Sequence, residues 1–322
     1  MPLNRVRVAV VGAGQFGRQH MRVIRQSPQA ELAGVLDTDA ARAAAAAAEF
    51  GCPALADLEA VARRADAAVV ATPTVTHAAV GCALLEAGLD VLVEKPIAAT
   101  MEDAGRLIET AARCGRILQV GHLERFNPAV TALEAALTTP LFFEIHRLSP
   151  FSPRSLDVDV ILDLMIHDLD IVLSLTGAQP QEIRAAGISI LTPKVDIASV
   201  RLAFPSGAVA NLTASRVSTE RVRKLRLFQP HEYVSVDYGR QEAFVLSVTP
   251  DGRIASRNLE VARSEPLRLE LESFFECVRT RRAPRVDGTA ACRALEVALN
   301  ILDKIEEHAQ LVATTLAAAR RG

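Results

Sequence analysis

The sequence predicts an α/β protein in which a doubly wound parallel sheet precedes an α+β domain with a large, mostly antiparallel open sheet. Two observations carry this prediction. Apolar strands and helical stretches alternate at a short period up to residue 122, which is typical of a parallel sheet with helices on both faces. From about Leu141 the pattern changes to strand-like runs separated by turns, as in an antiparallel sheet. We therefore expect two domains, residues 1–122 and residues 123–322.

The first domain should begin with a strand over 6–11, followed by a glycine turn and a helix over about 15–27. The second strand ends at Asp37. Six consecutive alanines, which are strong helix formers, predict a helix over 39–50 with Gly51 as its C-cap. The same alternation then predicts strands at 67–71, 90–94 and 116–121, and helices at about 76–87 and 101–114.

The second domain should contain a helix over about 158–176 and two closing helices at about 267–282 and 289–310. Its strands are expected at 141–148, 182–191, 196–204, 207–217, 222–229 and 232–238. So few helices cannot cover both faces of such a sheet.

The first strand leads directly into a GxGxxG motif formed by Gly12, Gly14 and Gly17. The first glycine permits a tight turn, the second lets the backbone approach a pyrophosphate, and the third lets the helix pack closely on the strand. The helix that begins there directs free N–H groups at the phosphates. Asp37, twenty positions after the last glycine, can accept hydrogen bonds from the ribose hydroxyls. This combination predicts a Rossmann dinucleotide-binding domain.

Asp37 also bears on which dinucleotide binds. A carboxylate at this place repels a 2′-phosphate, and NADP sites usually have an arginine or lysine just after the strand. Thr38, Asp39 and Ala40 follow here, and the nearest cation, Arg42, lies one helical turn later. NAD is therefore expected rather than NADP.

Composition argues against several other classes of function. The net charge of −2 gives no electrostatic case for binding nucleic acid or an anionic membrane. The five cysteines lie far apart without a CxxC pair, which argues against a zinc site or a disulfide framework and fits a reducing cytoplasm. The chain opens on a strand rather than a signal segment, and no apolar run reaches the roughly 18 residues of a membrane span. We expect a soluble cytoplasmic protein without a metal.

The helix over 158–176 is apolar except for one polar stripe, whose members are Asp159, Asp163, His167, Asp170 and Ser174. Because unpaired buried carboxylates are costly, the stripe should face water, a partner or a cleft. A catalytic pair facing the cofactor is the favoured interpretation. A solvent-facing stripe, or a metal site formed by Asp163, His167 and Asp170, are the alternatives.

Lys95 follows a strand, and Pro96 ends that strand after it. The lysine should therefore lie at the carboxyl edge of the parallel sheet, where ligands of such folds bind. A surface lysine paired with Glu94 is the alternative. The cofactor-binding residues expected from the motif and from this edge are Gly12, Gly14, Gln15, Phe16, Gly17, Asp37, Thr72, Pro73, His77, Glu94, Lys95 and Pro96.

These motifs resemble the glucose–fructose oxidoreductase/inositol dehydrogenase (Gfo/Idh/MocA) family. The features that carry the resemblance are the glycine loop, Glu94-Lys95-Pro96, the segment from Gly121-His122 to Asn127-Pro128, and Asp163-x-x-x-His167. The resemblance covers essentially the whole chain. It implies that Lys95, Asp163 and His167 are the catalytic residues, and that the C-terminal domain binds substrate and builds a homodimer or homotetramer through its sheet.

The reaction so implied is the oxidation of a secondary alcohol by NAD, in which a base accepts the hydroxyl proton. His167 is the preferred base because imidazole ordinarily titrates near neutral pH. Asp163 would orient the imidazole or contact the sugar, and Lys95 would stabilise the developing alkoxide. Lys95 as the base is the alternative.

The sequence of residues 121–130 resembles that of the subgroup of this family that oxidises the C3 hydroxyl of UDP-N-acetylglucosamine. The substrate contacts expected next to the cleft are His122, Arg125, Asn127 and Arg154. A basic stretch could receive a diphosphate, or could instead form a solvated sheet face or an oligomer rim. Its members are Arg216, Arg221, Arg223, Lys224 and Arg226.

Two other functions are open on this fold. An NAD-using glycosidase oxidises its sugar transiently and releases no reduced cofactor. A non-catalytic regulator senses NAD without turnover, although the joint presence of Lys95, Asp163 and His167 argues against it.

Overall fold

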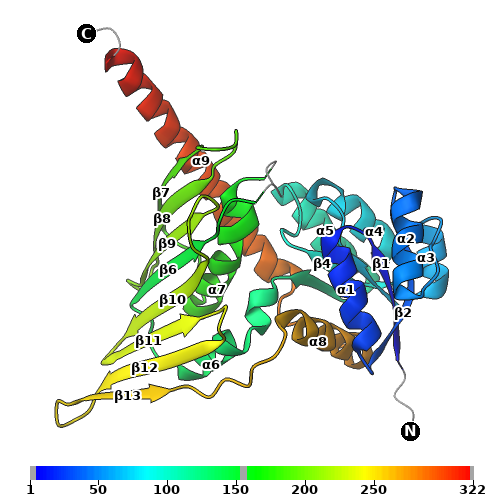
Figure 1. Cartoon of the computed structure of the whole chain (residues 1–322), viewed down its shortest axis with the longest axis horizontal. Coiled ribbons are helices and arrows are strands. Elements are labelled where there is room, and N and C mark those ends of the chain that lie inside the picture. The colour runs from blue at the N-terminus through cyan, green and yellow to red at the C-terminus, as the bar shows by residue number, and fades with distance from the viewer. Residues whose placement is uncertain (1–4, 153–157, 320–322) are drawn as a thin grey trace. The chain divides into compact units, whose positions relative to one another are not determined.

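The computed structural model describes residues 5–152 and 158–319 and divides the chain into two compact units. Unit 1 consists of Met1–Phe126 and Glu265–Cys292, and unit 2 of Asn127–Ser264 and Arg293–Gly322. Within the described residues, unit 1 contains a five-stranded parallel sheet and unit 2 an eight-stranded, mostly antiparallel sheet (Figure 1). The predicted fold class is confirmed.

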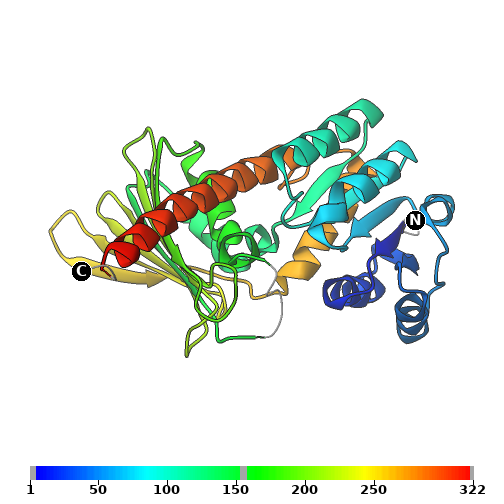
Figure 2. The same cartoon turned by 90° about the horizontal axis from the view of Figure 1, so that it is seen from above.

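The sheet of unit 1 has the strand order β2-β1-β3-β4-β5. Its strands are β1 (Val6–Val11), β2 (Ala30–Leu36), β3 (Ala67–Val70), β4 (Asp90–Glu94) and β5 (Leu118–Gly121). Its helices are α1 (Gln15–Gln26), α2 (Ala40–Phe50), α3 (Leu58–Arg64), α4 (His77–Glu86), α5 (Met101–Cys114) and α8 (Pro266–Thr280), with short 3-10 turns η1 (Thr74–Thr76) and η2 (Leu123–Phe126). α1 and α8 pack on one face, and α4 and α5 on the other (Figure 2).

Most elements of unit 1 lie where the sequence predicts them. α2 begins after Asp39, whose carboxylate accepts hydrogen bonds from backbone N–H groups of the first turn, and it ends at Gly51 with φ of 63°. α3 is not predicted above. Val61 is the buried residue of this seven-residue helix, so the segment has no apolar period that would reveal it.

The segment Glu265–Cys292 belongs to unit 1, whereas the sequence division at residue 122 places it in the second domain. The physical reason is the apolar side of α8. Leu271, Phe274 and Phe275 are buried in one core with Val8 of β1 and Met21 of α1. This helix therefore completes the first unit, although it follows it by more than a hundred residues.

The sheet of unit 2 has the strand order β13-β12-β11-β10-β6-β9-β8-β7, in which β6 and β9 are parallel neighbours. Its strands are β6 (Phe142–Leu148), β7 (Glu182–Ile188), β8 (Ile197–Ala203), β9 (Val209–Ser215), β10 (Val222–Gln229), β11 (Glu232–Asp237), β12 (Glu242–Val248) and β13 (Ile254–Asn258). Its helical elements are α6 (Pro128–Ala136), the π turn η3 (Ile161–Met165), α7 (Ile166–Thr176) and α9 (Gly288–Ala319), whose residues up to Cys292 belong to unit 1. No helix in the described part of the chain, α9 included, is long and apolar enough to cross a membrane.

Three elements of unit 2 are absent from the sequence prediction: α6, β12 and β13. β13 is almost wholly exposed at the edge of the sheet, so it has no buried face to give an alternating pattern. α6 is short and begins directly after Asn127, which caps it, with Pro128 in its first turn.

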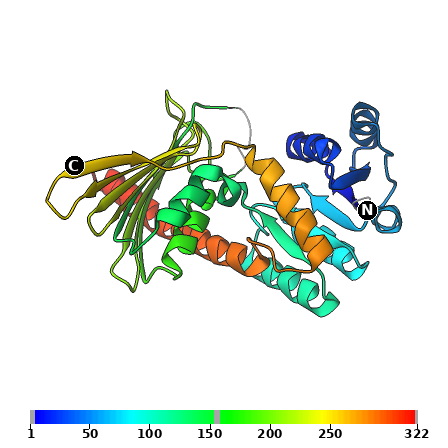
Figure 3. The same ribbon diagram turned by 90° about the horizontal axis from the view of Figure 1, so that it is seen from below.

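One face of the unit 2 sheet is covered by helices. Residues of α6, α7 and α9 form a single core with the inward side chains of the strands (Figures 1 and 3). On β8, Val200 and Leu202 lie in this core, whereas Ile197 and Ala203 on the opposite face are half-buried. The second face therefore carries apolar side chains that no element of this unit covers within the described residues.

Candidate functional site

The glycine loop between β1 and α1 has two glycines that the fold requires. Gly12 has φ of 102°, and a Cβ there would overlap the carbonyl oxygen of Ala71. A Cβ on Gly17 would overlap the carbonyl oxygen of Gly12, so a larger residue would push α1 away from the strand. A Cβ on Gly14, in contrast, would meet no protein atom within 4 Å. The space above Gly14 is open, as a site for an approaching pyrophosphate must be.

The first turn of α1 presents the remaining loop residues outward. Gln15 is exposed, and 55% of the surface of Phe16 is exposed. Their N–H groups lie in the first turn, where a helix offers no carbonyl partner. The loop therefore has free donors for an anion and an exposed aromatic ring beside them.

Asp37 is held against the glycine loop. Its Oδ2 accepts a hydrogen bond from the N–H of Ala13 at 2.7 Å, and its Oδ1 accepts one from the N–H of Asp39 at 2.9 Å. Arg42 lies 3.6 Å from Asp37 and 3.3 Å from Asp39. The nearby cation is thus already flanked by two carboxylates, which disfavours a 2′-phosphate at this place.

His77 ties two loops at the carboxyl edge of the sheet together. Its Nε2 lies 2.9 Å from the carbonyl oxygen of Thr72, and its Nδ1 lies 3.0 Å from that of Pro96. Burial lowers the pKa of His77, although these two carbonyl contacts oppose the shift. With 1% of its surface exposed, the ring has no free nitrogen for a cofactor. His77 therefore supports Thr72 and Pro96, and a direct contact with the cofactor stays a prediction.

Glu94 anchors Lys95 from inside the protein. Its Oε1 lies 2.7 Å from Nε2 of His20 on α1, and its Oε2 accepts a hydrogen bond from the N–H of Lys95 at 3.2 Å. Burial alone would raise the pKa of Glu94, but the His20 hydrogen bond and the charges of His20 and Lys95 together lower it. Glu94 is buried and Lys95 half-buried, so the lysine, rather than the glutamate, is accessible to a ligand.

A second buried carboxyl group, Glu270 of α8, lies in the same unit and is completely inaccessible to solvent. Burial raises its pKa well above the usual value, and the negative charge of Glu94 raises it further. The backbone carbonyl of Glu270 accepts a hydrogen bond from Gln119 of β5 at 3.2 Å. The surroundings of Glu270 therefore favour the protonated form of its carboxyl group in the folded protein.

Glu270→Gln should stabilise the protein increasingly as pH rises. A carboxyl group with a raised folded-state pKa binds its proton more tightly when folded, so its contribution is complete below the unfolded value near 4.5 and is lost at higher pH. Glutamine keeps the shape and cannot ionise. Melting temperatures between about pH 5 and about pH 8 should diverge in favour of the variant, with Glu272→Gln on the same helix as control. If the melting temperatures of wild type and Glu270→Gln changed with pH in parallel, a raised pKa of Glu270 would be contradicted.

Two of the expected substrate contacts lie at η2, His122 directly before it and Arg125 within it. His122 has 1% of its surface exposed, while Arg125 is half-buried. The guanidinium of Arg285 lies 5.7 Å from the ring of Phe126 in the same turn. Arg125 is thus the more accessible of the two for a ligand.

Asn127 has a structural role that the sequence analysis above does not assign. Its Oδ1 accepts a hydrogen bond from the N–H of Ala129, as the N-cap of α6, and its Nδ2 donates to the carbonyl oxygen of Tyr238 at 3.1 Å. Asn127 is buried. The substrate contact expected of Asn127 stays a prediction beside this capping role, and Arg154 lies outside the described residues.

Asp163 and His167 lie on either side of the junction between η3 and α7. Asp163 is within the π turn and is half-buried, and His167 is in the first turn of α7 and buried. π turns of this kind occur frequently at functional sites. The pair therefore occupies the irregular part of a helix that is otherwise packed in the core.

The polar stripe is not uniformly exposed, contrary to the simple solvent-facing interpretation. Ser174 is exposed and Asp159 and Asp163 are half-buried, but His167 and Asp170 are buried. Across the described residues, no three His, Cys, Asp or Glu side chains converge in a way that could hold a metal ion.

Asp168, which lies off the stripe, forms a buried ion pair that sequence reasoning missed. Its carboxylate accepts two hydrogen bonds from Arg147 of β6, at 2.7 and 2.8 Å. The guanidinium of Arg147 also lies 5.5 Å from the ring of Tyr238. The sequence signal was available: Arg147 takes an inward position of a strand whose other inward residues, Phe143 and Ile145, are core residues. The pair fixes the rotation of α7 next to His167.

The basic stretch is largely engaged within unit 2. Arg216 faces Asp196, Arg226 lies 3.2 Å from Glu144, and Lys224 lies 4.0 Å from Asp237. These pairings favour a structural role over a diphosphate site.

The comparisons with known proteins agree over nearly the whole chain. Residues 6–122 match the model of an oxidoreductase family with an NAD-binding Rossmann fold, and residues 131–229 match the GFO/IDH/MocA C-terminal domain. The UDP-N-acetylglucosamine 3-dehydrogenase of Acidithiobacillus ferrooxidans is 38% identical over 95% of this chain and 99% of that protein. Its solved structure covers 94% of this chain and 98% of its own, with a TM-score of 0.89. The scyllo-inositol 2-dehydrogenase (NAD(+)) of Bacillus subtilis is 27% identical over 92% of this chain and 93% of that protein.

Proposed function

Because this chain belongs to the Gfo/Idh/MocA family of NAD-binding oxidoreductases, we propose that it oxidises the C3 hydroxyl of UDP-N-acetylglucosamine. The observation that carries the proposal is the similarity to the Acidithiobacillus ferrooxidans enzyme of that name, which spans both units. Lys95, Asp163 and His167 are all present here. Neither the glycosidase nor the regulator gains support from the relatives reported above.

The residues of the glycine loop fit NAD. The open approach to Gly14 suits a pyrophosphate, and the fixed carboxylate of Asp37 suits a ribose with free hydroxyls. When bound, NAD supplies the hydride acceptor of the reaction. His167 accepts the proton of the sugar hydroxyl, Asp163 orients the imidazole or the sugar, and the Lys95 ammonium stabilises the negative charge that develops on the oxygen.

Asp37→Ala should weaken NAD binding by on the order of 1–3 kcal/mol, because a charge-assisted hydrogen bond to the ribose is lost. Wild-type protein should bind NAD more tightly than NADP, since Arg42 is flanked by Asp37 and Asp39. Titration of both cofactors measures these affinities, and Asp57→Ala, at the cap of α3, is a control. Equal or tighter binding of NADP by the wild type would refute the preference.

The uncovered sheet face is proposed to form a homo-oligomer. Four rings form a ladder across β6, β10, β11 and β12, with centroid distances of 5.6, 5.1 and 5.9 Å between Phe142, Phe228, Tyr233 and Phe244. Phe228 and Phe244 each have 37% of their surface exposed. Such an exposed apolar surface is typical of an interface, and two-fold pairing is the commonest closed arrangement.

Light scattering during size exclusion should therefore give the mass of a dimer or tetramer of the 34.6 kDa chain. Phe244→Asp should lower that mass, whereas Val75→Asp, an exposed position of unit 1, should leave it unchanged. A wild-type mass equal to one chain at micromolar concentration would refute the proposal.

The substrate is tested by offering wild-type protein and NAD a panel of UDP-sugars, free sugars and polyols. We expect sustained NADH formation with UDP-N-acetylglucosamine and much less with free N-acetylglucosamine. Turnover of a polyol alone would assign a different substrate, and sugar release without NADH would indicate the glycosidase.

The five free cysteines support a reducing compartment, and we place the protein in the cytoplasm.

A further inference from the structure

Asp196, at the end of the loop between β7 and β8, is a fully buried carboxylate that the proposed reaction does not use. Its Oδ2 accepts hydrogen bonds from three consecutive backbone N–H groups, of Ile190 at 2.7 Å, Leu191 at 2.6 Å and Thr192 at 2.9 Å. Its Oδ1 accepts one from the Thr192 hydroxyl at 2.8 Å. Burial alone would raise the pKa of Asp196, but these hydrogen bonds lower it to about 2. The carboxylate is therefore ionised and orders this loop.

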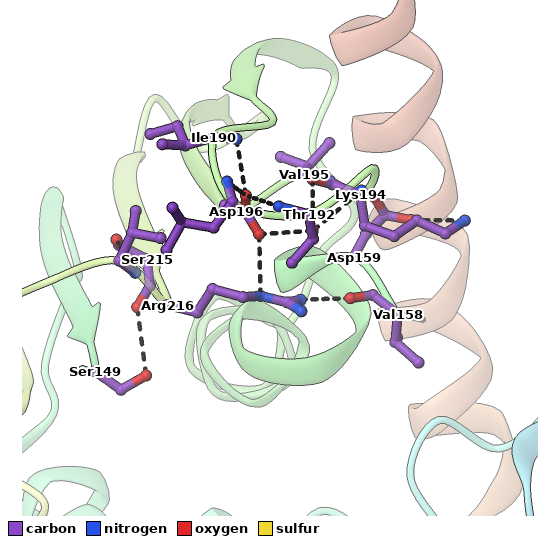
Figure 4. Close-up of polar contacts among 12 residues, drawn as sticks. Ser149, Val158, Asp159, Ile190, Thr192, Lys194, Val195, Asp196, Ser215 and Arg216 are labelled. Atoms are coloured by element: carbon purple, nitrogen blue, oxygen red, sulfur yellow. Dashed lines mark hydrogen bonds and ion pairs between the residues drawn. The ribbon is translucent and has the colours of Figure 1, made fainter. Parts of the chain in front are cut away.

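Arg216 extends this arrangement toward the helix that carries Asp163. Its Nε lies 3.8 Å from Oδ1 of Asp196, and its Nη2 donates a hydrogen bond to the carbonyl oxygen of Val158 (Figure 4). Its own backbone N–H donates to the carbonyl oxygen of Asp196 at 2.9 Å. Arg216 is itself buried, so its charge is matched inside unit 2 rather than by solvent.

The loop between β7 and β8 also binds Asp159 and Val160, the two residues that follow Val158. The N–H of Val195 donates to Oδ1 of Asp159 at 2.8 Å, and the N–H of Val160 donates to the carbonyl oxygen of Val195 at 3.0 Å. Lys194 lies 3.8 Å from the other carboxylate oxygen of Asp159 (Figure 4). Val158, Asp159 and Val160 are therefore each held by Arg216 or by the loop between β7 and β8. We call this set of contacts the 158–160 clamp.

The clamp lies one turn before Asp163. The N–H of Asp163 donates to the carbonyl oxygen of Asp159 at 3.0 Å, and the π turn η3 then leads into α7. A π turn holds one more residue than an α turn and is rare, so a helix that contains it needs support to keep this register. Arg147 and Asp168 hold the α7 side of the turn, and the clamp holds the other side.

We propose that Asp196 and Arg216 are positioning residues that keep the π turn in register and thereby fix the places of Asp163 and His167. The catalytic consequence rests on the proposed function, whereas the structural consequence does not. A displacement of a reacting group by about 1 Å can lower a rate by about a hundredfold. Loss of the clamp should therefore reduce turnover without touching the cofactor, which the glycine loop of unit 1 binds.

The test compares wild type with Arg216→Gln and Arg216→Lys. Arg263→Gln removes an exposed ion pair with Glu242 in the same unit and is the matched control. Each purified protein is examined for kcat, for the dissociation constant of NAD, and for hydrogen exchange of peptides covering residues 158–167. Thr192→Val, which removes the hydroxyl that bonds to Asp196 and to the backbone of Lys194, is a milder variant that should show the same pattern if Arg216→Gln does not fold.

Arg216→Gln should lower kcat by about tenfold to a hundredfold, leave NAD affinity unchanged, and speed exchange in 158–167 but not in unit 1. Arg216→Lys should recover part of the loss, since an ammonium group still pairs with Asp196. In an Asp163→Asn background, Arg216→Gln should lower kcat by a smaller factor than in the wild type, because the part of its effect that acts through the Asp163 carboxylate is already lost. Unchanged kcat and exchange, or fully additive effects, would overturn the proposal. Faster exchange in a protein without sugar dehydrogenase activity would support the clamp and refute the proposed function instead.

Discussion

His167→Ala and Lys95→Ala should each lower kcat by about a hundredfold or more, the usual loss when a positioned proton-transfer group is removed. The reason differs between the two. In the proposed reaction, His167 accepts the proton of the reacting hydroxyl, whereas the Lys95 ammonium stabilises the charge that develops on that oxygen. The dissociation constant of NAD changes little in either variant, because the loop and Asp37 stay intact. Steady-state kinetics and cofactor titration measure the two quantities separately.

Two variants make this prediction sharper. Asp163→Asn should cost less than His167→Ala if Asp163 orients rather than accepts the proton, and Lys304→Ala, an exposed lysine of α9, should leave kcat unchanged. Activity should survive a chelator, since the chemistry assigned here uses no metal. A His167→Ala protein with near wild-type kcat would transfer the role of base to Lys95.

Gly17→Ala should abolish NAD binding and destabilise the protein, whereas Gly14→Ala should abolish binding alone. The difference follows from the space around each residue. A Cβ at position 17 would overlap the carbonyl oxygen of Gly12, so α1 must move, but a Cβ at position 14 meets no protein atom within 4 Å. Overpacking of this kind costs about 1–3 kcal/mol. We therefore predict that a bound pyrophosphate, rather than the fold, requires a glycine at position 14.

Thermal denaturation and NAD titration distinguish the two variants. Gly14→Ala should melt with the wild type in the absence of NAD, and Gly17→Ala below it. Gly105→Ala, on α5, is the control, because its Cβ would also meet no atom within 4 Å and it lies away from the loop. Wild-type NAD affinity in Gly14→Ala would show that the pyrophosphate does not approach this residue.

The sequence predicts the parallel half of the fold well because each strand of that sheet is a short apolar run between capped helices. Asp39 and Gly51, for example, mark both ends of α2. The assignment of α8 to unit 1 could not be predicted, since an amphipathic helix does not reveal which core it joins. β13 was missed because an exposed edge strand has no alternating pattern to recognise.

The candidate site was predictable where a motif lies on consecutive residues. The glycine loop and Glu94-Lys95-Pro96 are of this kind. The supporting contacts were not, because their members are far apart in the sequence. Glu94 and His20 are separated by 74 positions, and Arg147 and Asp168 by 21. The π turn was missed for another reason: a stripe drawn at 3.6 residues per turn assumes a regular helix, and η3 is not regular.

In the proposed reaction, the hydride transferred to NAD comes from C3 of the sugar. This origin of the hydride is tested most directly with UDP-N-acetylglucosamine that carries deuterium on C3, incubated with the wild-type protein and NAD and followed by mass spectrometry of the reduced cofactor. We expect NADH that contains one deuterium and a sugar nucleotide that has lost it. Reduced cofactor without deuterium would place the oxidation at another carbon, and no reduced cofactor at all would contradict the proposed activity.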